Sequence, residues 1–242
     1  MAADLSEMSV RRWRLLEAVG LAGVGVSLLA VLVINVALIP PVLIFGVLYV
    51  LLGYAVYRWI ERPRVALAAA VLALLGLLGN LPFIIEDVSH IDSWGSFAPS
   101  AVSVVLGLAG IAAGLISFFS PAMAGARSLA MAAAALAVVL AVGSIGISLS
   151  ASNDEAQSGD VTVLASDVEF PETLEASAGS VGFFITNEDL VRHTFVIEST
   201  DVKLEVPASK DRRIEADLVA GEYKFICDVP GHERMEGTLT VR

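Results

Sequence analysis

Five long apolar runs in the first 150 residues constrain the fold of this chain more than any other feature. A helix rises about 1.5 Å per residue, so a run of about 20 apolar residues can cross about 30 Å of hydrocarbon. None of the runs carries a charge in its central part, and they cover approximately residues 16–39, 42–60, 65–85, 98–119 and 128–150. Residues 1–150 are therefore predicted to form a membrane α-helical bundle of about five transmembrane helices.

The breaks between the runs hold prolines or polar residues. They fall at Pro40–Pro41, at the Glu61–Arg64 turn, in a polar loop over 86–97, and between Pro121 and Arg127. Asn35 and Asn80 are the most polar residues inside the runs, and no ionisable residue is expected at mid-depth. A proton or ion path is therefore not predicted. The simplest interpretation of the bundle is an anchor; a docking surface for a membrane protein, or a quinone or lipid site, stays open.

Two further patterns concern how the helices are placed. Gly110 and Gly114 are spaced as in membrane helices that pack closely together, which predicts a tight helix–helix contact. The arginines predict orientation, because basic residues favour the cytoplasmic side. With five alternating spans, all seven arginines of this part lie on one side, which makes the N-terminus cytoplasmic and the C-terminus extracytoplasmic: Arg11, Arg12, Arg14, Arg58, Arg62, Arg64 and Arg127.

Charge divides the chain into two physically different parts. Residues 1–150 carry seven acidic and seven basic residues, so the whole net charge of −11 belongs to residues 151–242. Over the full chain 56% of residues are apolar and 17% are charged, whereas soluble domains average about 45–50% and about 25%. These values exclude a plain soluble enzyme and a disordered chain. The single cysteine, Cys227, excludes an intramolecular disulfide.

The second part begins with a polar, turn-rich stretch over 151–159, which is predicted to be a linker. In residues 160–242, short runs of Val, Ile, Phe and Thr alternate with Gly, Pro and Asn. This pattern predicts an antiparallel β-sandwich of about seven strands. The expected strands are Val161–Ala165, Val181–Thr186, Thr194–Ile197, Lys203–Val206, Arg212–Ala216, Tyr223–Ile226 and Thr238–Val241.

Four residues of the second part form a candidate metal site. Cys227, His232 and Met235 follow the spacing Cys-x4-His-x2-Met, and His193 lies 34 residues before the cysteine. Two imidazoles, a thiolate and a weak thioether are the ligand set of mononuclear blue copper. Zinc typically takes four strong N, O or S ligands, for which a thioether is a poor choice. The prediction is one type 1 copper per chain, with Pro230–Gly231 rigidifying the ligand loop.

These segments resemble the cupredoxin family. Gly221–His232 is similar to the ligand loop of plastocyanin- and azurin-like proteins, and Asn187–Val196 to the strand bearing their first histidine. The resemblance covers roughly residues 160–242 and implies a Greek-key sandwich with a type 1 copper site. It also implies a turn-capping role for Asn187. Met235 departs from the common pattern, because it follows His232 by three positions with only two residues between, as in oxidase subunit II domains.

The combined features predict a membrane-anchored type 1 copper protein for one-electron transfer on the outer face of a membrane. Its partners would be membrane lipid and a redox protein in or on that membrane. An extracytoplasmic copper-binding module for sensing, storage or delivery is the alternative. No enzyme activity is expected, because the histidines for a second metal site are missing. The acidic net charge argues against nucleic-acid binding.

Overall fold

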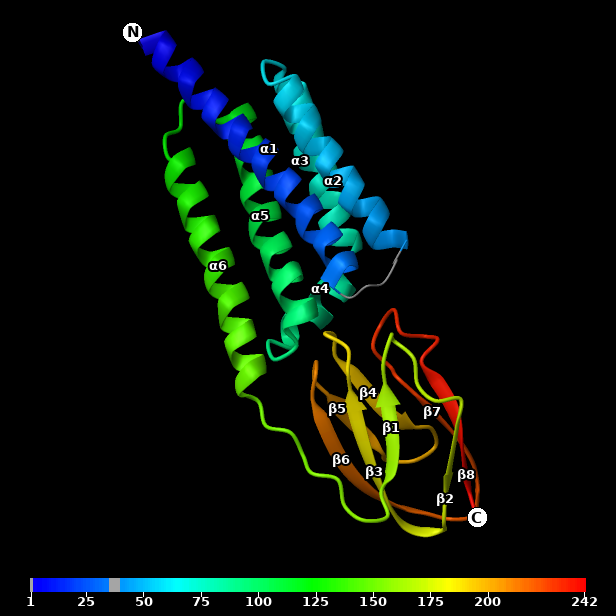
Figure 1. The fold of residues 1–242 in the computed structure, drawn as a ribbon. Coiled ribbons are helices and arrows are strands. Elements are labelled where there is room, and N and C mark those ends of the chain that lie inside the picture. Colours follow the sequence, from blue (N-terminus) through cyan, green and yellow to red (C-terminus); the bar gives the residue numbers. More distant parts are fainter. Residues whose placement is uncertain (1, 35–39) are drawn as a thin grey trace. The chain divides into compact units, whose positions relative to one another are not determined.

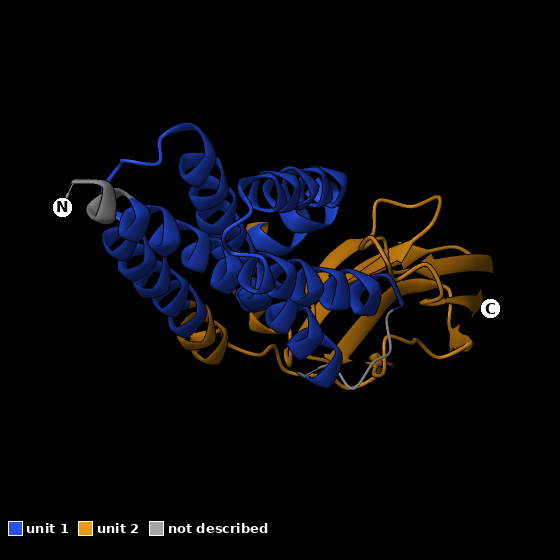
Figure 2. Cartoon of the chain, turned by 90° about the horizontal axis from the view of Figure 1, so that it is seen from above, with its two compact units in different colours: residues 1–88, 98–143 blue, residues 89–97, 144–242 orange. Residues whose placement is uncertain are grey.

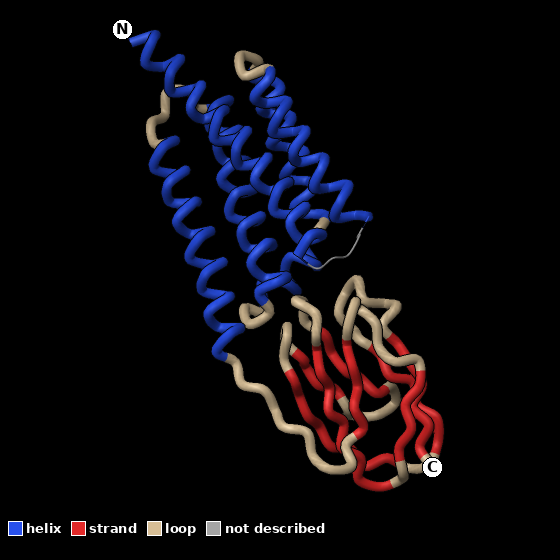
Figure 3. The backbone as a smooth tube through the Cα atoms, viewed as in Figure 1, coloured by secondary structure: helices blue, strands red, loops and turns tan. Residues whose placement is uncertain are grey.

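The fold comprises a helical part followed by a β-sheet part (Figures 1 and 3). The structure is a computed structural model that describes residues 2–34 and 40–242. Six helices come first in the chain and eight strands follow within this described part. The helices are α1 Ala2–Ile34, α2 Pro40–Arg58, α3 Pro63–Gly79, α4 Leu81–Ser89, α5 Trp94–Phe119 and α6 Ala126–Ser150.

Four helices in the described residues are long and apolar enough to cross a membrane, or five if a bent pair counts as one span. The four are Glu7–Val33, Pro40–Arg58, Trp94–Phe119 and Ala126–Ser150. They indicate membrane insertion, and the expected helical membrane part is confirmed. The end of the first expected run, with Asn35, lies outside the described residues.

The third expected run, 65–85, is not one straight helix. It is divided between α3 and α4, which meet at an angle of 64°. Asn80 lies at the break, and both its backbone amide (3.2 Å) and its side-chain Nδ2 (2.8 Å) donate to the Gly76 carbonyl. Pro82 follows, has no N–H to donate and crowds the preceding turn. The segment expected to be a polar loop over 86–97 is shorter than expected, because α4 extends to Ser89 and α5 begins at Trp94.

Small residues let the helices of the membrane part approach closely. An added Cβ at Gly20 of α1 would lie 3.1 Å from the Cα of Gly110 in α5. The contact expected from the glycine spacing in α5 is therefore present, and its partner is α1. A cluster of buried side chains continues the contact between α1, α2, α3 and α5: Ala18, Leu21, Val24, Tyr49, Val56, Ala69, Ala73 and Ile111.

Two ionisable side chains are buried in this bundle, at the start of the first expected run, 16–39. Arg14 is 7% exposed and Glu17 is 0% exposed. Both belong to α1 and lie one helical turn apart. Hydropathy averaged over a long run conceals a single acidic residue, so the run predicted the helix correctly but gave no signal of this buried pair.

The β part consists of two sheets. The strands are β1 Val161–Ala165, β2 Thr173–Ala176, β3 Gly179–Asn187, β4 His193–Ile197, β5 Lys203–Val206, β6 Asp211–Leu218, β7 Gly221–Ile226 and β8 Glu236–Val241. One sheet has the order β1-β3-β6 and the other the order β2-β8-β7-β4-β5. The expected sandwich is confirmed, and all seven expected strands are present.

The pairing of the strands differs from the expected antiparallel pattern in two places. β1 pairs with β3 in parallel, and β2 pairs with β8 in parallel. The strand β2 was not expected, because Thr173–Ala176 contains no Val, Ile or Phe, the residues that marked the expected strands. It forms by pairing with β8, more than 60 residues later in the chain, so its hydrogen-bond partners are remote in sequence.

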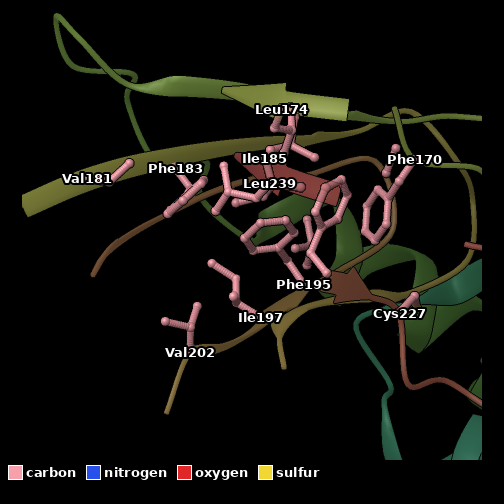
Figure 4. Close-up of a cluster of buried hydrophobic side chains, with 14 of the residues drawn as sticks. Phe170, Leu174, Val181, Phe183, Ile185, Phe195, Ile197, Val202, Cys227 and Leu239 are labelled. Carbon is pink, nitrogen blue, oxygen red and sulfur yellow. The ribbon is translucent and has the colours of Figure 1, made fainter. Parts of the chain in front are cut away.

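Buried aromatic and aliphatic side chains fill the space between the two sheets (Figure 4). Phe183, Phe195 and Phe225 are fully buried, and the ring of Phe195 lies 5.3 Å from that of Phe183 and 5.6 Å from that of Phe225. Both ring pairs are tilted, at 43° and 40°, and aromatic contacts at such distances add to the gain from burial. Cys227 belongs to the same cluster and lies at one end of it in Figure 4.

The chain divides into two compact units (Figure 2). One comprises residues 1–88 and 98–143, and the other comprises 89–97 and 144–242. The second unit contains the whole sandwich together with the expected linker, 151–159. Hydrogen bonds tie this linker to β6: the Arg213 amide donates to Asp154 (2.8 Å), the Asp211 amide donates to Asn153 (3.2 Å), and the Asp154 amide donates to the Asp211 carbonyl (3.1 Å). Arg212 also donates to the Ser152 carbonyl (2.8 Å).

Candidate metal centre

Strand pairing brings the candidate ligands together. β4 begins with His193, and β7 ends immediately before Cys227. These strands are antiparallel, with Val196 opposite Ile226, so the start of β4 meets the end of β7. His232 lies in the loop between β7 and β8, which folds back to the same end of the sheet. Residues 34 positions apart in the sequence therefore meet at one end of the sandwich.

The three side chains converge closely. The Nδ1 atom of His193 lies 3.2 Å from the Nδ1 atom of His232 and 4.0 Å from the Sγ atom of Cys227. The Cys227 sulfur lies 3.6 Å from the Nδ1 atom of His232. One ligand atom from each residue falls within 4.8 Å of the others. The group can therefore hold one metal ion between a sulfur and two imidazole nitrogens.

The ligand loop is fixed by its own backbone. The Cys227 amide donates to the Met235 carbonyl (2.9 Å), and the Met235 amide donates to the His232 carbonyl (2.9 Å). Gly231 has φ +93°, a conformation that glycine adopts readily and that turns the chain before His232. Met235 is fully buried in the core cluster. The fourth predicted ligand thus lies directly beside Cys227 in the backbone pairing.

The sulfur of Cys227 is buried and hydrogen-bonded. The backbone amide of Thr194 donates to it at 3.3 Å. Burial alone would raise the pKa of the Cys227 thiol, but hydrogen bonds with His193, His232 and the Thr194 amide lower it to about 5. The thiolate, which is the form that binds metal, is therefore available at neutral pH.

A second layer of hydrogen bonds fixes Thr194 itself. The hydroxyl of Thr194 donates to the Asp228 carboxylate (2.7 Å) and accepts from the Asp228 amide (2.9 Å). The ammonium group of Lys203 lies 2.5 Å from the other Asp228 oxygen. These contacts hold the residue after His193 against the residue after Cys227, which fixes the spacing of the two ligands.

A carboxylate orients His193. The Nε2 atom of His193 lies 2.8 Å from Asp189 Oδ2. A carboxylate only accepts, so Nε2 carries a hydrogen, and Nδ1 on the other side of the ring faces Cys227, where it can bind a metal ion in place of a proton. The carboxylate in turn accepts from the backbone amides of Asp167 (2.9 Å) and Val168 (3.0 Å). Burial alone would raise the pKa of Asp189, but these hydrogen bonds hold it below its usual range.

Sequence analysis did not identify Asp189 as part of the site. The signal was present in its spacing, since an acidic residue four positions before a ligand histidine can reach the ring across a turn. Asn187 makes that turn: its Oδ1 accepts from the Asp189 amide (2.9 Å), and its Nδ2 donates to the carbonyls of Val191 (2.9 Å) and Pro207 (2.9 Å). The capping role expected of Asn187 is therefore observed.

The donor set fits copper. A soft thiolate and two neutral imidazole nitrogens match the strong ligands of a mononuclear copper site, and a buried thioether is adjacent in the chain. The three ligand residues differ in exposure: His193 and Cys227 are buried, and His232 is partly exposed. The third histidine of the chain, His90, does not belong to this group.

The family comparison agrees with this geometry. Residues 132–241 match the family described as Cupredoxin-like domain. The C-terminal part of the chain is a cupredoxin-like domain. The family and the cofactor expected from the ligand loop are therefore confirmed: the domain can bind one copper ion through His193, Cys227 and His232. The match supports a function of the copper-binding, electron-transfer kind. The family of the membrane part is not identified.

Several solved structures resemble the cupredoxin-like domain. An amicyanin variant in its Cu(I) form is 17% identical and covers 36% of this chain and 87% of its own, with a TM-score of 0.31. Amicyanin from Paracoccus versutus is 14% identical over 36% of this chain and 86% of its own, also with a TM-score of 0.31. A copper-containing nitrite reductase from Thermus scotoductus is 25% identical over 38% of this chain and 24% of its own, with a TM-score of 0.29. No curated protein matches the chain.

Proposed function

We propose that this protein is a membrane-anchored type 1 copper protein that transfers single electrons on the outer face of a membrane. The observation that carries the proposal is the convergence of His193, Cys227 and His232 within 4.8 Å, on a loop fixed by its own backbone bonds. Bound copper would supply a Cu(I)/Cu(II) couple at this site. The residues of the chain would supply the two other requirements of an electron carrier, a rigid site and a route to a partner.

The first requirement of an electron carrier is a site that changes little between redox states. Asp189 holds His193 and the Thr194 amide holds the Cys227 sulfur. Met235 is fully buried and tied by backbone bonds to Cys227 and His232. Ligands that are fixed in this way need not rearrange when the charge of the site changes. Met235 would be the fourth ligand, a weak thioether donor.

The second requirement is a route to a partner. His232 is the partly exposed member of the group, whereas His193 and Cys227 are buried. In the proposal, electrons enter and leave through the exposed edge of His232, and the buried ligands keep water away. The role is that of a carrier and not of an enzyme, because the proposed site has no open position for a substrate.

The proposed orientation rests on the arginines of the helical part. Five spans, with α3 and α4 counted as one bent span, would put the two ends of the chain on opposite sides of the membrane. Arginine asymmetry then makes the N-terminus cytoplasmic and the copper domain extracytoplasmic. The redox partner would be a protein in the membrane or on its outer face.

The test uses the full-length protein in detergent, loaded with copper. We expect one copper per chain and an intense thiolate-to-copper absorption band in the oxidised state. The band should be lost in Cys227→Ser and His232→Ala and kept in the matched control His90→Ala, whose ring lies outside the group. A band that survives in Cys227→Ser would contradict the ligand assignment.

The same preparation distinguishes a carrier from a copper-delivery module. A carrier should pass through repeated cycles of chemical oxidation and reduction with its copper retained. A delivery module should release Cu(I) to a competing chelator on reduction. Bound copper measured after each cycle decides between them, and stepwise loss of copper would refute the carrier function.

A further inference from the structure

The buried carboxyl group of Glu17 is the feature that the proposed copper function leaves unexplained. Glu17 lies in the candidate span Glu7–Val33, one helical turn after Arg14 and at the start of the apolar part of the span. Its side chain is 0% exposed, and neither carboxyl oxygen has a hydrogen-bond partner in the part of the chain that the structure describes. Buried ionisable groups in membrane helices are rare, and they mark functional sites more often than structural ones.

The helices around Glu17 make room for its carboxyl group. An added Cβ at Gly114 of α5 would lie 2.5 Å from Glu17 Oε1 and 2.9 Å from the Cβ of Ala70 in α3. The carboxyl group therefore lies between α1, α3 and α5, against a glycine and an alanine. These two residues offer no side-chain donor. Packing accommodates the shape of the acid but gives no compensation for a negative charge.

Arg14 interacts with Glu17 through their charges but makes no hydrogen bond to its carboxyl group. Arg14, one turn away, donates from its Nη1 atom to the Ile60 carbonyl, and its Nε atom has no hydrogen-bond partner among the described residues. The described structure contains no ion pair between Arg14 and Glu17 within 4.0 Å. The helix α5 contains no ionisable residue. Among the other charged side chains that the structure describes in the helices and in the α2–α3 turn, Glu86 and Asp87 of α4 are partly buried. The rest are exposed: Glu7, Arg11, Arg12, Arg58, Glu61, Arg62, Arg64 and Arg127.

We propose that Glu17 is a proton-binding site inside the helix bundle. A buried carboxylate that no group hydrogen-bonds is less stable than the neutral acid, so the packed bundle holds the acid. Release of the proton to water leaves a carboxylate that the contact between Gly114 and Ala70 cannot stabilise. Proton loss therefore requires α1 to separate from α5, and the α1–α5 contact depends on this proton. The inference is independent of the copper site.

Infrared spectroscopy of the full-length protein in lipid nanodiscs tests the protonation state directly. Near neutral pH we expect the carbonyl stretch of a protonated carboxylic acid in the wild type, its loss in Glu17→Gln, and its retention in the matched control Glu61→Gln, which alters an exposed acid. Glu17→Gln keeps the size of the side chain, and far-ultraviolet circular dichroism verifies its fold. A wild type without the band, or a band that persists in folded Glu17→Gln, would overturn the proposal.

Two substitutions in α5 test where the protonated acid lies. Gly114→Ala alone should displace the carboxyl group and remove or shift the infrared band, because its Cβ would overlap Glu17 Oε1. Val104→Ala in the same helix is the control and should leave the band in place. An unchanged band in folded Gly114→Ala would show that the acid responsible does not lie against α5, and would refute the assignment.

Thermal melting tests the coupling between proton binding at Glu17 and helix packing. Since the packed bundle binds a proton that the opened bundle can release, the wild-type helical unit should melt at progressively lower temperature as pH rises above about 4.3, the ordinary pKa of a solvated glutamate. Glu17→Gln should lose this dependence on pH, because its amide does not ionise. Melting curves that coincide for both proteins at every pH would overturn the proposed coupling.

Discussion

The axial role of Met235 gives the sharpest prediction, because its structural and electronic contributions can be separated. Met235→Leu conserves volume at a position that is 0% exposed, so it should destabilise the domain by less than about 1.5 kcal/mol. Met235→Gln buries an amide and should cost about 1–3 kcal/mol unless the amide finds a partner. His193, Cys227 and His232 are unchanged in both variants, so each should still bind one copper.

The reduction potential should move in opposite directions in the two variants. Leucine removes a donor to copper, which disfavours Cu(II) and raises the potential. The oxygen of glutamine is a harder donor than the thioether, which favours Cu(II) and lowers the potential. Spectroelectrochemical titration of the blue band in the full-length protein measures both shifts, and thermal unfolding measures the stability. Equal potentials in all three copper-loaded proteins would refute axial ligation by Met235.

Three other predictions concern the copper domain. Asp189→Asn should weaken Cu(II) binding about 10- to 100-fold by releasing His193, measured by chelator competition against the neighbouring control Glu188→Gln. Phe195→Ala should lower the free energy of unfolding by about 3–5 kcal/mol, measured by denaturant titration, because the ring is 0% exposed. The bidentate contact with Arg213 lowers the pKa of Asp160, so the stability that it provides is present above about pH 4 and is lost as pH falls below that value. In an acid unfolding titration, Asp160→Asn should not show this loss of stability below about pH 4.

In the helical part, the sequence predicted those features that depend on the pattern of residues within a single segment. Apolar runs of about 20 residues identify spans, because each helical residue bonds within its own segment. The same averaging concealed the break at Asn80, whose amide groups bond Gly76, although the adjacent Pro82 was a visible signal. It also concealed Glu17. A single acid hardly changes the hydropathy of a run, and its burial depends on where Gly114 of another helix lies.

In the copper domain too, local sequence determined some features, and contacts between distant segments determined the others. The sequence by itself determined the chemistry of the site, because a soft thiolate, two imidazoles and a thioether are properties of residue types and their spacing. It also determined seven strands, since alternation of polarity is local. The tertiary structure alone decided that β2 pairs with β8, that Asp189 reaches His193, and that the three strong donors meet within 4.8 Å. Each of these depends on contacts between chain segments, whose free energy is gained only when the whole sandwich closes around its core.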